Sequence, residues 1–152
     1  MSIQERLEQL GLELPQAPPP GGVYKSVVVS GGQLYVSGQP PRLSDGSLIT
    51  GKVGRDLTME EGKAAARQVG LTMLATIAEQ LGGLDRIMRL VKTFGMVNCF
   101  PEFDQHPQVI NGFSELMREL LGEDAGLGAR SAVGMSLPGN IACEIEAIFE
   151  LE

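Results

Sequence analysis

Ten residues near the C-terminal end of the chain, from Ile141 to Glu150, alternate almost strictly between apolar and polar side chains. A period of two is that of a β-strand, in which successive side chains point to opposite faces of a sheet. A sheet with one apolar face must bury that face under a second layer of structure. One side of the predicted strand carries Ile141, Cys143, Ile145, Ala147 and Phe149, and the other carries Ala142, Glu144, Glu146, Ile148 and Glu150.

Two longer segments have the pattern of helices that can form this second layer. In the first, Thr58 and Glu61 have the spacing of a capping box, and apolar residues recur at helical intervals until Gly82-Gly83. The second begins near Pro107, a residue suited to the first turn of a helix, and ends at Gly122. The sequence therefore predicts two helices packed on the sheet.

The remaining segments complete an α+β domain. Strands are predicted at residues 27–29, 34–38, 87–100 and 131–135, and a short amphipathic helix is predicted at residues 2–10. The order is then β-β-α-β-α-β-β after the N-terminal helix, and two helices can cover only one face of such a sheet. If the second face is apolar, another copy of the chain is expected to cover it. The residues expected on that face are Val27, Val29, Val91 and Phe94.

Composition fits one soluble domain and excludes several kinds of site. A length of 152 residues is typical of a single domain, and the net charge of −7 argues against a general nucleic-acid binder. Cys99 and Cys143 lie in separate apolar runs, so a disulfide framework is not expected. No apolar stretch approaches the roughly 20 residues of a membrane helix, and we expect a cytoplasmic protein. The single histidine, His106, excludes sites that need two imidazoles and is interpreted as a helix-start residue without a catalytic role.

One pair of charged residues stands out in the last third of the chain. The turn at Pro138-Gly139 is expected to fold strand 141–150 back, antiparallel to strand 131–135. Arg130 and Glu144 lie at comparable distances from this turn, so they are expected within a few residues of each other across the hairpin. The simplest interpretation is a cross-strand surface ion pair, worth at most about 1 kcal/mol. A shared functional site is the alternative.

The same stretch resembles the C-terminal signature of a known family. This is the Rid family, also called YjgF, and the resemblance covers roughly residues 23–150. Residues 1–22 are then an N-terminal helix and proline-rich lead-in, and residues 23–152 a Rid-like domain. The matching segments are Gly128–Val133, Leu137-Pro138 and Glu144–Ile148, with Tyr24, Tyr35–Gln39, Gly51–Gly54 and Asn111 in the family's order.

The resemblance implies a fold, an assembly and an activity. The fold is chorismate-mutase-like, with two helices on one face of the sheet, and the assembly is a homotrimeric barrel with small-molecule sites between subunits. The activity is hydrolytic deamination of small 2-imino or enamine acids, such as 2-iminobutanoate, to 2-oxo acids and ammonia, without a cofactor or metal. Two alternatives are a non-catalytic trimeric protein that binds 2-oxo acids, and an endoribonuclease, which fits the acidic charge poorly.

The resemblance also assigns roles to residues of the expected site. Arg130 offers a bidentate fork to the substrate carboxylate, and Glu144 orients a water molecule and moves its proton. Tyr24 hydrogen-bonds the substrate or closes the pocket, Ser37-Gly38 contacts the carboxylate, and Asn111 supplies a neutral polar wall. Each of the last three also has a plainer interpretation: a strand-start aromatic residue, a strand-end turn and a solvated helix residue.

Some positions depart from the family pattern. Gly128 stands where many members have proline, Ala132 where many have a pocket cysteine, and Cys143 where a branched aliphatic residue is usual. The segment 98–107 and the N-terminal extension differ as well. These differences place the chain in a divergent subgroup of the family it resembles.

Overall fold

The computed structural model describes all 152 residues and contains the elements in the predicted order. None of its helices combines the length and apolar character needed to cross a membrane. A short 3₁₀ turn, η1, covers Pro138–Asn140. The helices are α1 (Ile3–Gln9), α2 (Met59–Leu81) and α3 (His106–Leu121), and the strands are β1 (Val27–Ser30), β2 (Gln33–Gln39), β3 (Ile87–Val97), β4 (Ala129–Gly134) and β5 (Cys143–Leu151).

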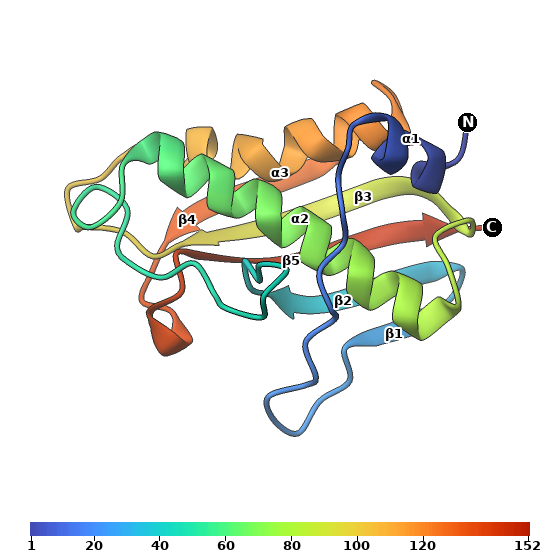
Figure 1. Cartoon of the computed structure of the whole chain (residues 1–152), viewed down its shortest axis with the longest axis horizontal. Helices are drawn as coiled ribbons and strands as arrows, with labels where there is room; N and C mark the ends of the chain where they lie inside the picture. The colour runs from blue at the N-terminus through green and yellow to red at the C-terminus, as the bar shows by residue number, and fades with distance from the viewer.

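The strands form one mixed sheet, and the two long helices cover one of its faces. The strand order is β1-β2-β5-β3-β4, with β5 in the centre. Helices α2 and α3 lie side by side across the same face (Figure 1), and they contact each other and the strands beneath them. The α+β fold with helices on one face is therefore confirmed. The trimeric assembly remains a prediction.

The predicted helix ends are also confirmed. The Thr58 side chain accepts a hydrogen bond from the Glu61 amide, the Glu61 side chain accepts one from the Thr58 amide, and α2 begins directly after this capping box. Gly82 ends α2 with a φ of 75°, in the left-handed region that favours glycine. Helix α3 has Pro107 in its first turn and ends before Gly122.

The predicted hairpin between β4 and β5 is wrong. Strand β4 pairs with β3 in parallel, and β5 lies antiparallel between β2 and β3. The reason lies in α3, which follows β3 and carries the chain back across the sheet, so β4 starts at the same end as β3. The chain then turns at η1 and enters the central position of the sheet as β5.

The face of the sheet away from the helices is partly apolar, but not through all the expected residues. Directly paired residues point to the same face. Val27 and Val29 pair with Val36 and Leu34, which lie in the core beneath the helices, so their expected place on the open face is wrong. Phe94 pairs with Glu146 and does lie on the open face. The apolar residues assigned to the open face by this register are Val28, Tyr35, Phe94, Met96, Val133 and Ile148.

The N-terminal segment is part of the same core. Ile3 and Leu7 of α1 are buried, and both belong to the main hydrophobic cluster. Helix α1 contacts α3, and the following segment runs along the molecule toward β1 (Figure 1). The guanidinium of Arg42 donates a hydrogen bond to the carbonyl of Gln16 and holds this segment in place. The proline-rich segment is thereby brought to the edge of a pocket.

Candidate functional site

A pocket of about 770 Å³ lies where the proline-rich segment, the end of β2, the η1 turn and β5 meet. Four residues that the sequence singled out line it together: Tyr24, Ser37, Gly38 and Glu144. Gly21, Gln39, Met96 and Glu146 also contribute to the walls. Glu144 and Glu146 of β5 are the two acidic residues of the pocket. This pocket is the candidate site of the molecule.

Glu144 is the ionisable group at the centre of this pocket. It pairs with Met96 on the open face of the sheet and is half-buried. Burial raises the pKa of the Glu144 carboxyl, and the negative charge of Glu146 raises it further. No hydrogen bond within the chain offsets either effect. The pKa of this carboxyl is therefore shifted toward neutral pH from that of an ordinary glutamate, which is the direction that favours general acid–base catalysis.

Gly38 leaves the space that the Glu144 carboxylate occupies. A Cβ atom built at Gly38 would lie 2.5 Å from Glu144 Oε2 and 2.9 Å from its Cδ. A Cβ atom does not approach other heavy atoms that closely, so a side chain at this position must displace the carboxylate. The absence of a side chain at Gly38 thus determines where Glu144 points.

We predict that Gly38→Ala lowers activity at this site at least about tenfold while changing stability by no more than about 1 kcal/mol. The carboxylate must move, but it ends a flexible side chain, so the strain is small. Gly22→Ala is the matched control, because a Cβ there meets only Tyr24 ring atoms at 3.6–3.7 Å, an ordinary contact. Activity assays and urea unfolding of both variants check this. Equal activity in the two would contradict it.

Tyr24 and Ser37 are held by contacts with the backbone. The Tyr24 hydroxyl accepts a hydrogen bond from the Gly21 amide at 3.0 Å, and its side chain is largely exposed at the pocket wall. The Ser37 hydroxyl donates to the carbonyl of Lys25 at 2.6 Å. The hydroxyl proton of Tyr24 and the lone pairs of Ser37 are therefore free to meet a ligand.

Arg130 lies elsewhere, on the edge strand β4, and has only neutral partners. Its guanidinium donates to Asn111 Oδ1 at 2.8 Å, to Ser114 Oγ at 3.0 Å and to the Pro107 carbonyl at 3.3 Å. All three acceptors come from α3. Burial lowers the pKa of the guanidinium, which still leaves it charged at neutral pH. The structure thus brings Asn111 to Arg130 and fixes a cation without a counter-ion.

One chain does not bring Arg130 and Glu144 together. Arg130 pairs with Thr93, a buried residue that also pairs with Ala147 on the helix side of the sheet. Glu144 lies on the opposite face. The expected proximity across a hairpin is therefore wrong, and so is the surface ion pair, because none of the five ion pairs in the structure includes either residue.

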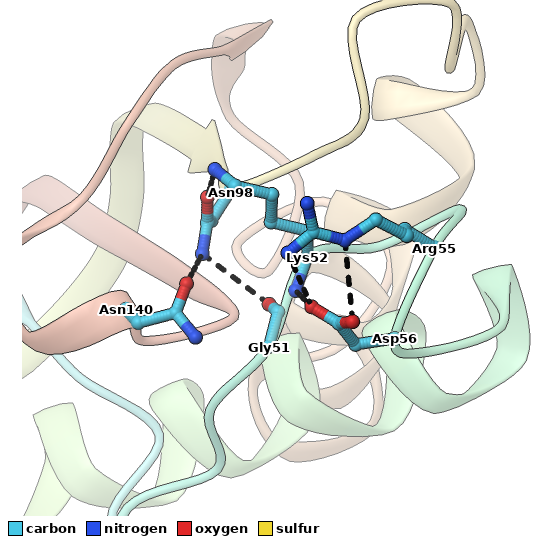
Figure 2. A network of polar contacts seen from close by, with 6 residues as sticks. All are labelled: Gly51, Lys52, Arg55, Asp56, Asn98 and Asn140. Carbon is cyan, nitrogen blue, oxygen red and sulfur yellow. Dashed lines mark hydrogen bonds and ion pairs between the residues drawn. The ribbon is translucent and has the colours of Figure 1, made fainter.

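A polar network that the sequence did not indicate fixes one wall of the pocket (Figure 2). The Asn98 amide donates to Asn140 Oδ1 at 2.9 Å and to the Gly51 carbonyl at 3.3 Å, and its oxygen accepts from Lys52 Nζ at 3.0 Å. Asn140 has a φ of 56° and ends η1, whose Pro138 lines the pocket. Asn98 therefore fastens the loop after residue 50 to the η1 turn.

No cluster of three or more metal-ligating side chains is present in the structure. Both cysteines are free thiols. The pocket around Glu144 offers carboxylates, hydroxyls and backbone groups. The separate Arg130 cluster offers a guanidinium with amide, hydroxyl and carbonyl neighbours.

Comparison with known proteins places the chain in a family. The family model described as "YjgF/chorismate mutase-like, putative endoribonuclease" matches residues 4–151. Protein TCP17 of Trypanosoma cruzi is 43% identical over 150 residues, which are 98% of this chain and 94% of that protein.

Two solved structures are similar over almost the whole chain. The protein Atu1372 from Agrobacterium tumefaciens is 42% identical, with a TM-score of 0.88 over 99% of this chain and 94% of that one. A "putative endoribonuclease" from Shewanella oneidensis MR-1 is 33% identical, with a TM-score of 0.94 over 99% of this chain and 100% of that one. With the family signature around Arg130 and Glu144 in place, this chain belongs to the YjgF/Rid family.

Proposed function

We propose that this protein hydrolyses small 2-imino or enamine acids, such as 2-iminobutanoate, to 2-oxo acids and ammonia, without a cofactor, at sites between the subunits of a homotrimer. The observation that carries the proposal is the guanidinium of Arg130. It is oriented by three neutral acceptors and has no carboxylate partner in the chain. A fixed and unpaired cation is suited to bind a small carboxylate.

Arg130 supplies the binding half of this site. A guanidinium has five N–H groups, and the contacts with Asn111, Ser114 and Pro107 use three of them. The two that remain are on Nε and Nη1 and point to different sides. A substrate carboxylate that replaces the long contact of Nη2 with the Pro107 carbonyl, at 3.3 Å, can take two parallel hydrogen bonds from Nη2 and one of these neighbours. Because Asn111 and Ser114 already fix the side chain, the substrate does not have to order it on binding.

Glu144 supplies the proton transfers. It accepts a proton from a water molecule whose oxygen adds to the C2 carbon of the imine. The π electrons of the C=N bond move to nitrogen, which takes that proton from Glu144. Glu144 then accepts the proton of the new C2 hydroxyl and delivers it to nitrogen as the C–N bond breaks, so that C2 becomes a carbonyl carbon and ammonia leaves. Burial and Glu146 raise the pKa of Glu144 toward the operating pH, which favours both transfers.

The position of these two residues on opposite faces of the sheet supports a site shared between chains. Strand β4 is at the edge of the sheet, so Arg130 can face a neighbouring molecule. The open face that carries Glu144 also exposes apolar side chains, among them Val28 at 47% and Tyr35 at 42% exposure. An interface over this face would bury those side chains and let Arg130 of one chain approach Glu144 of the next.

The direct test is ammonia release from enzymatically generated 2-iminobutanoate in the presence of the purified protein. A clear acceleration over buffer is expected. A rate no better than buffer would overturn the proposal for this substrate. Saturable binding of 2-oxo acids in calorimetry, with no effect on rate, would instead favour the non-catalytic alternative.

A complementation experiment tests the shared site. Co-expression of Arg130→Ala chains and Glu144→Gln chains gives mixed trimers. Each site in such a trimer takes residue 130 from one chain and residue 144 from its neighbour. Random assembly at equal ratio leaves both residues intact in about one quarter of the sites. We therefore expect about one quarter of wild-type activity from two inactive variants. No recovery, with mixed trimers demonstrated by tags, would overturn the shared site.

The names of some relatives raise the alternative of RNA cleavage. A general RNA-binding surface needs clustered cations, whereas this chain has a net charge of −7. The chain also has one histidine, so one chain cannot supply a two-histidine acid–base pair. These properties favour a small anionic substrate over a polynucleotide.

A further inference from the structure

A second reactive cluster lies apart from the candidate pocket, where β3 ends and α3 begins. The Cys99 sulfur is 3.4 Å from His106 Nε2, within hydrogen-bond distance for a thiol. Both side chains are half-buried and line a cavity of about 330 Å³. The cavity opens to solvent beside Met135 and Ser136, which are exposed. A small molecule can therefore reach the thiol.

The surrounding structure holds this pair in place from three directions. The Phe103 ring packs edge-on against His106, with centroids 5.5 Å apart and an interplanar angle of 84°. Cys99 follows Asn98, whose side chain is fixed by Lys52 and Asn140 (Figure 2). At Gly134 of β4, an added Cβ would lie 2.6 Å from His106 Nε2 and 2.7 Å from Cys99 Sγ. Any other residue at position 134 would place its Cβ in the space that Cys99 and His106 occupy.

The two cysteines of the chain differ in the groups around them. Burial raises the pKa of Cys99, while the positive charge of Lys52 acts in the opposite direction. The thiol is then protonated at neutral pH, and its reactivity depends on a base that takes the proton. His106 is in position to do this. Cys143 is fully buried, and burial and Glu144 raise its pKa strongly.

We propose that Cys99 and His106 form a covalent modification site for small α,β-unsaturated carbonyl compounds. His106 Nε2 accepts the thiol proton, and a sulfur electron pair forms a bond to the β-carbon of the electrophile. The π electrons of the C=C bond move to the α-carbon, which then takes the proton from the imidazolium. Nothing is oxidised or reduced, and no further reactant is needed. Pro101, Phe103 and Met135 contribute apolar groups to a cavity whose accessible surface is otherwise mostly polar, which suits a small, uncharged electrophile that carries a polar carbonyl.

The test is alkylation of the intact protein by acrylamide, followed by mass spectrometry and peptide mapping. At pH 7 we expect one adduct, on Cys99, formed at the same rate in wild type and in Cys143→Ser. Cys99→Ser should take up none. His106→Gln should react at least about tenfold more slowly, as expected for loss of a general base. Preferential labelling of Cys143, or equal rates in wild type and His106→Gln, would overturn the proposal.

A second measurement separates proton transfer from access to the cavity. At pH 10 bulk hydroxide ionises the thiol without help from His106, so the rates of wild type and His106→Gln should converge to within about twofold. Lys52, the charged group that acts on this thiol, is present in both proteins. A tenfold gap that persists at pH 10 would mean that His106 only shapes the cavity, and the proposal fails. His106→Asn provides the same comparison if the glutamine variant does not fold.

Discussion

Arg130→Ala is expected to lower kcat/KM for a 2-imino acid by about 10²- to 10⁴-fold. Each hydrogen bond between a guanidinium and a carboxylate contributes about 1.5–3 kcal/mol, and about 1.4 kcal/mol corresponds to a factor of ten. Two such bonds are lost together in the variant. The measurement is ammonia release as a function of substrate concentration.

Two control variants show whether the loss of activity comes from the planar guanidinium, which can donate two parallel hydrogen bonds. Arg130→Lys keeps the positive charge but cannot make two parallel hydrogen bonds, so we expect it to recover only part of the loss. Arg89→Ala removes an exposed arginine of β3 that donates to the Asp124 carbonyl, and it should leave activity unchanged. If Arg130→Lys were as active as wild type, Arg130 would act only as a point charge.

The effect of Arg130→Ala on folding should be small by comparison. Its three acceptors, in Asn111, Ser114 and Pro107, lie in the first turns of α3 at the edge of the sheet, where water can replace the guanidinium. A surface substitution of this kind changes the free energy of unfolding by about 0.5–1 kcal/mol. A folded but inactive variant is therefore the expected product.

The elements of this fold follow from the sequence, but the arrangement of two strands does not. Capping residues such as Thr58 and stops such as Gly82 act locally, so they predict the helices well. The alternation in β5 predicts correctly which of its side chains face the core. Alternation does not identify the neighbouring strand, however, because a strand in a hairpin and one in the sheet centre have the same period of two. The parallel pairing of β4 depends instead on the crossover through α3.

The candidate site was also predicted only in part from the sequence. Tyr24, Ser37, Gly38 and Glu144 line one pocket, and their roles in a reaction stay predictions. The distance between Arg130 and Glu144 depended on the incorrect hairpin, and the correct topology separates them. Contacts across a loop, such as that between Cys99 and His106, leave no periodic signal in the sequence. They arise only when the chain ends β3 and starts α3 at the same edge of the sheet.

Glu144→Gln is expected to lower kcat by about 10²- to 10⁴-fold with little change in the affinity for 2-oxo acids, because it removes proton transfer and keeps the shape of the side chain. Glu150→Gln is the matched control, since Glu150 lies on the same face of β5 and is exposed. Ammonia release and calorimetry give the two quantities. Loss of binding together with rate would instead make Glu144 a binding residue.

The same substitution should make the protein more stable at neutral pH, and the sign follows from the raised pKa of Glu144. Because the carboxyl binds its proton more tightly in the folded protein, the neutral form favours folding. This contribution to stability is complete at pH values below the pKa of a glutamate in the unfolded chain, about 4.3. It is lost as pH rises through the higher pKa of Glu144 in the folded protein. Glu144→Gln keeps the group neutral at every pH. Urea unfolding at equal protein concentration should therefore show a more stable variant at pH 7 to 8, and a difference that shrinks as pH approaches 4. A variant less stable than wild type at pH 8 would mean that the charged carboxylate has a stabilising partner, and the catalytic role argued from its environment would lose its basis.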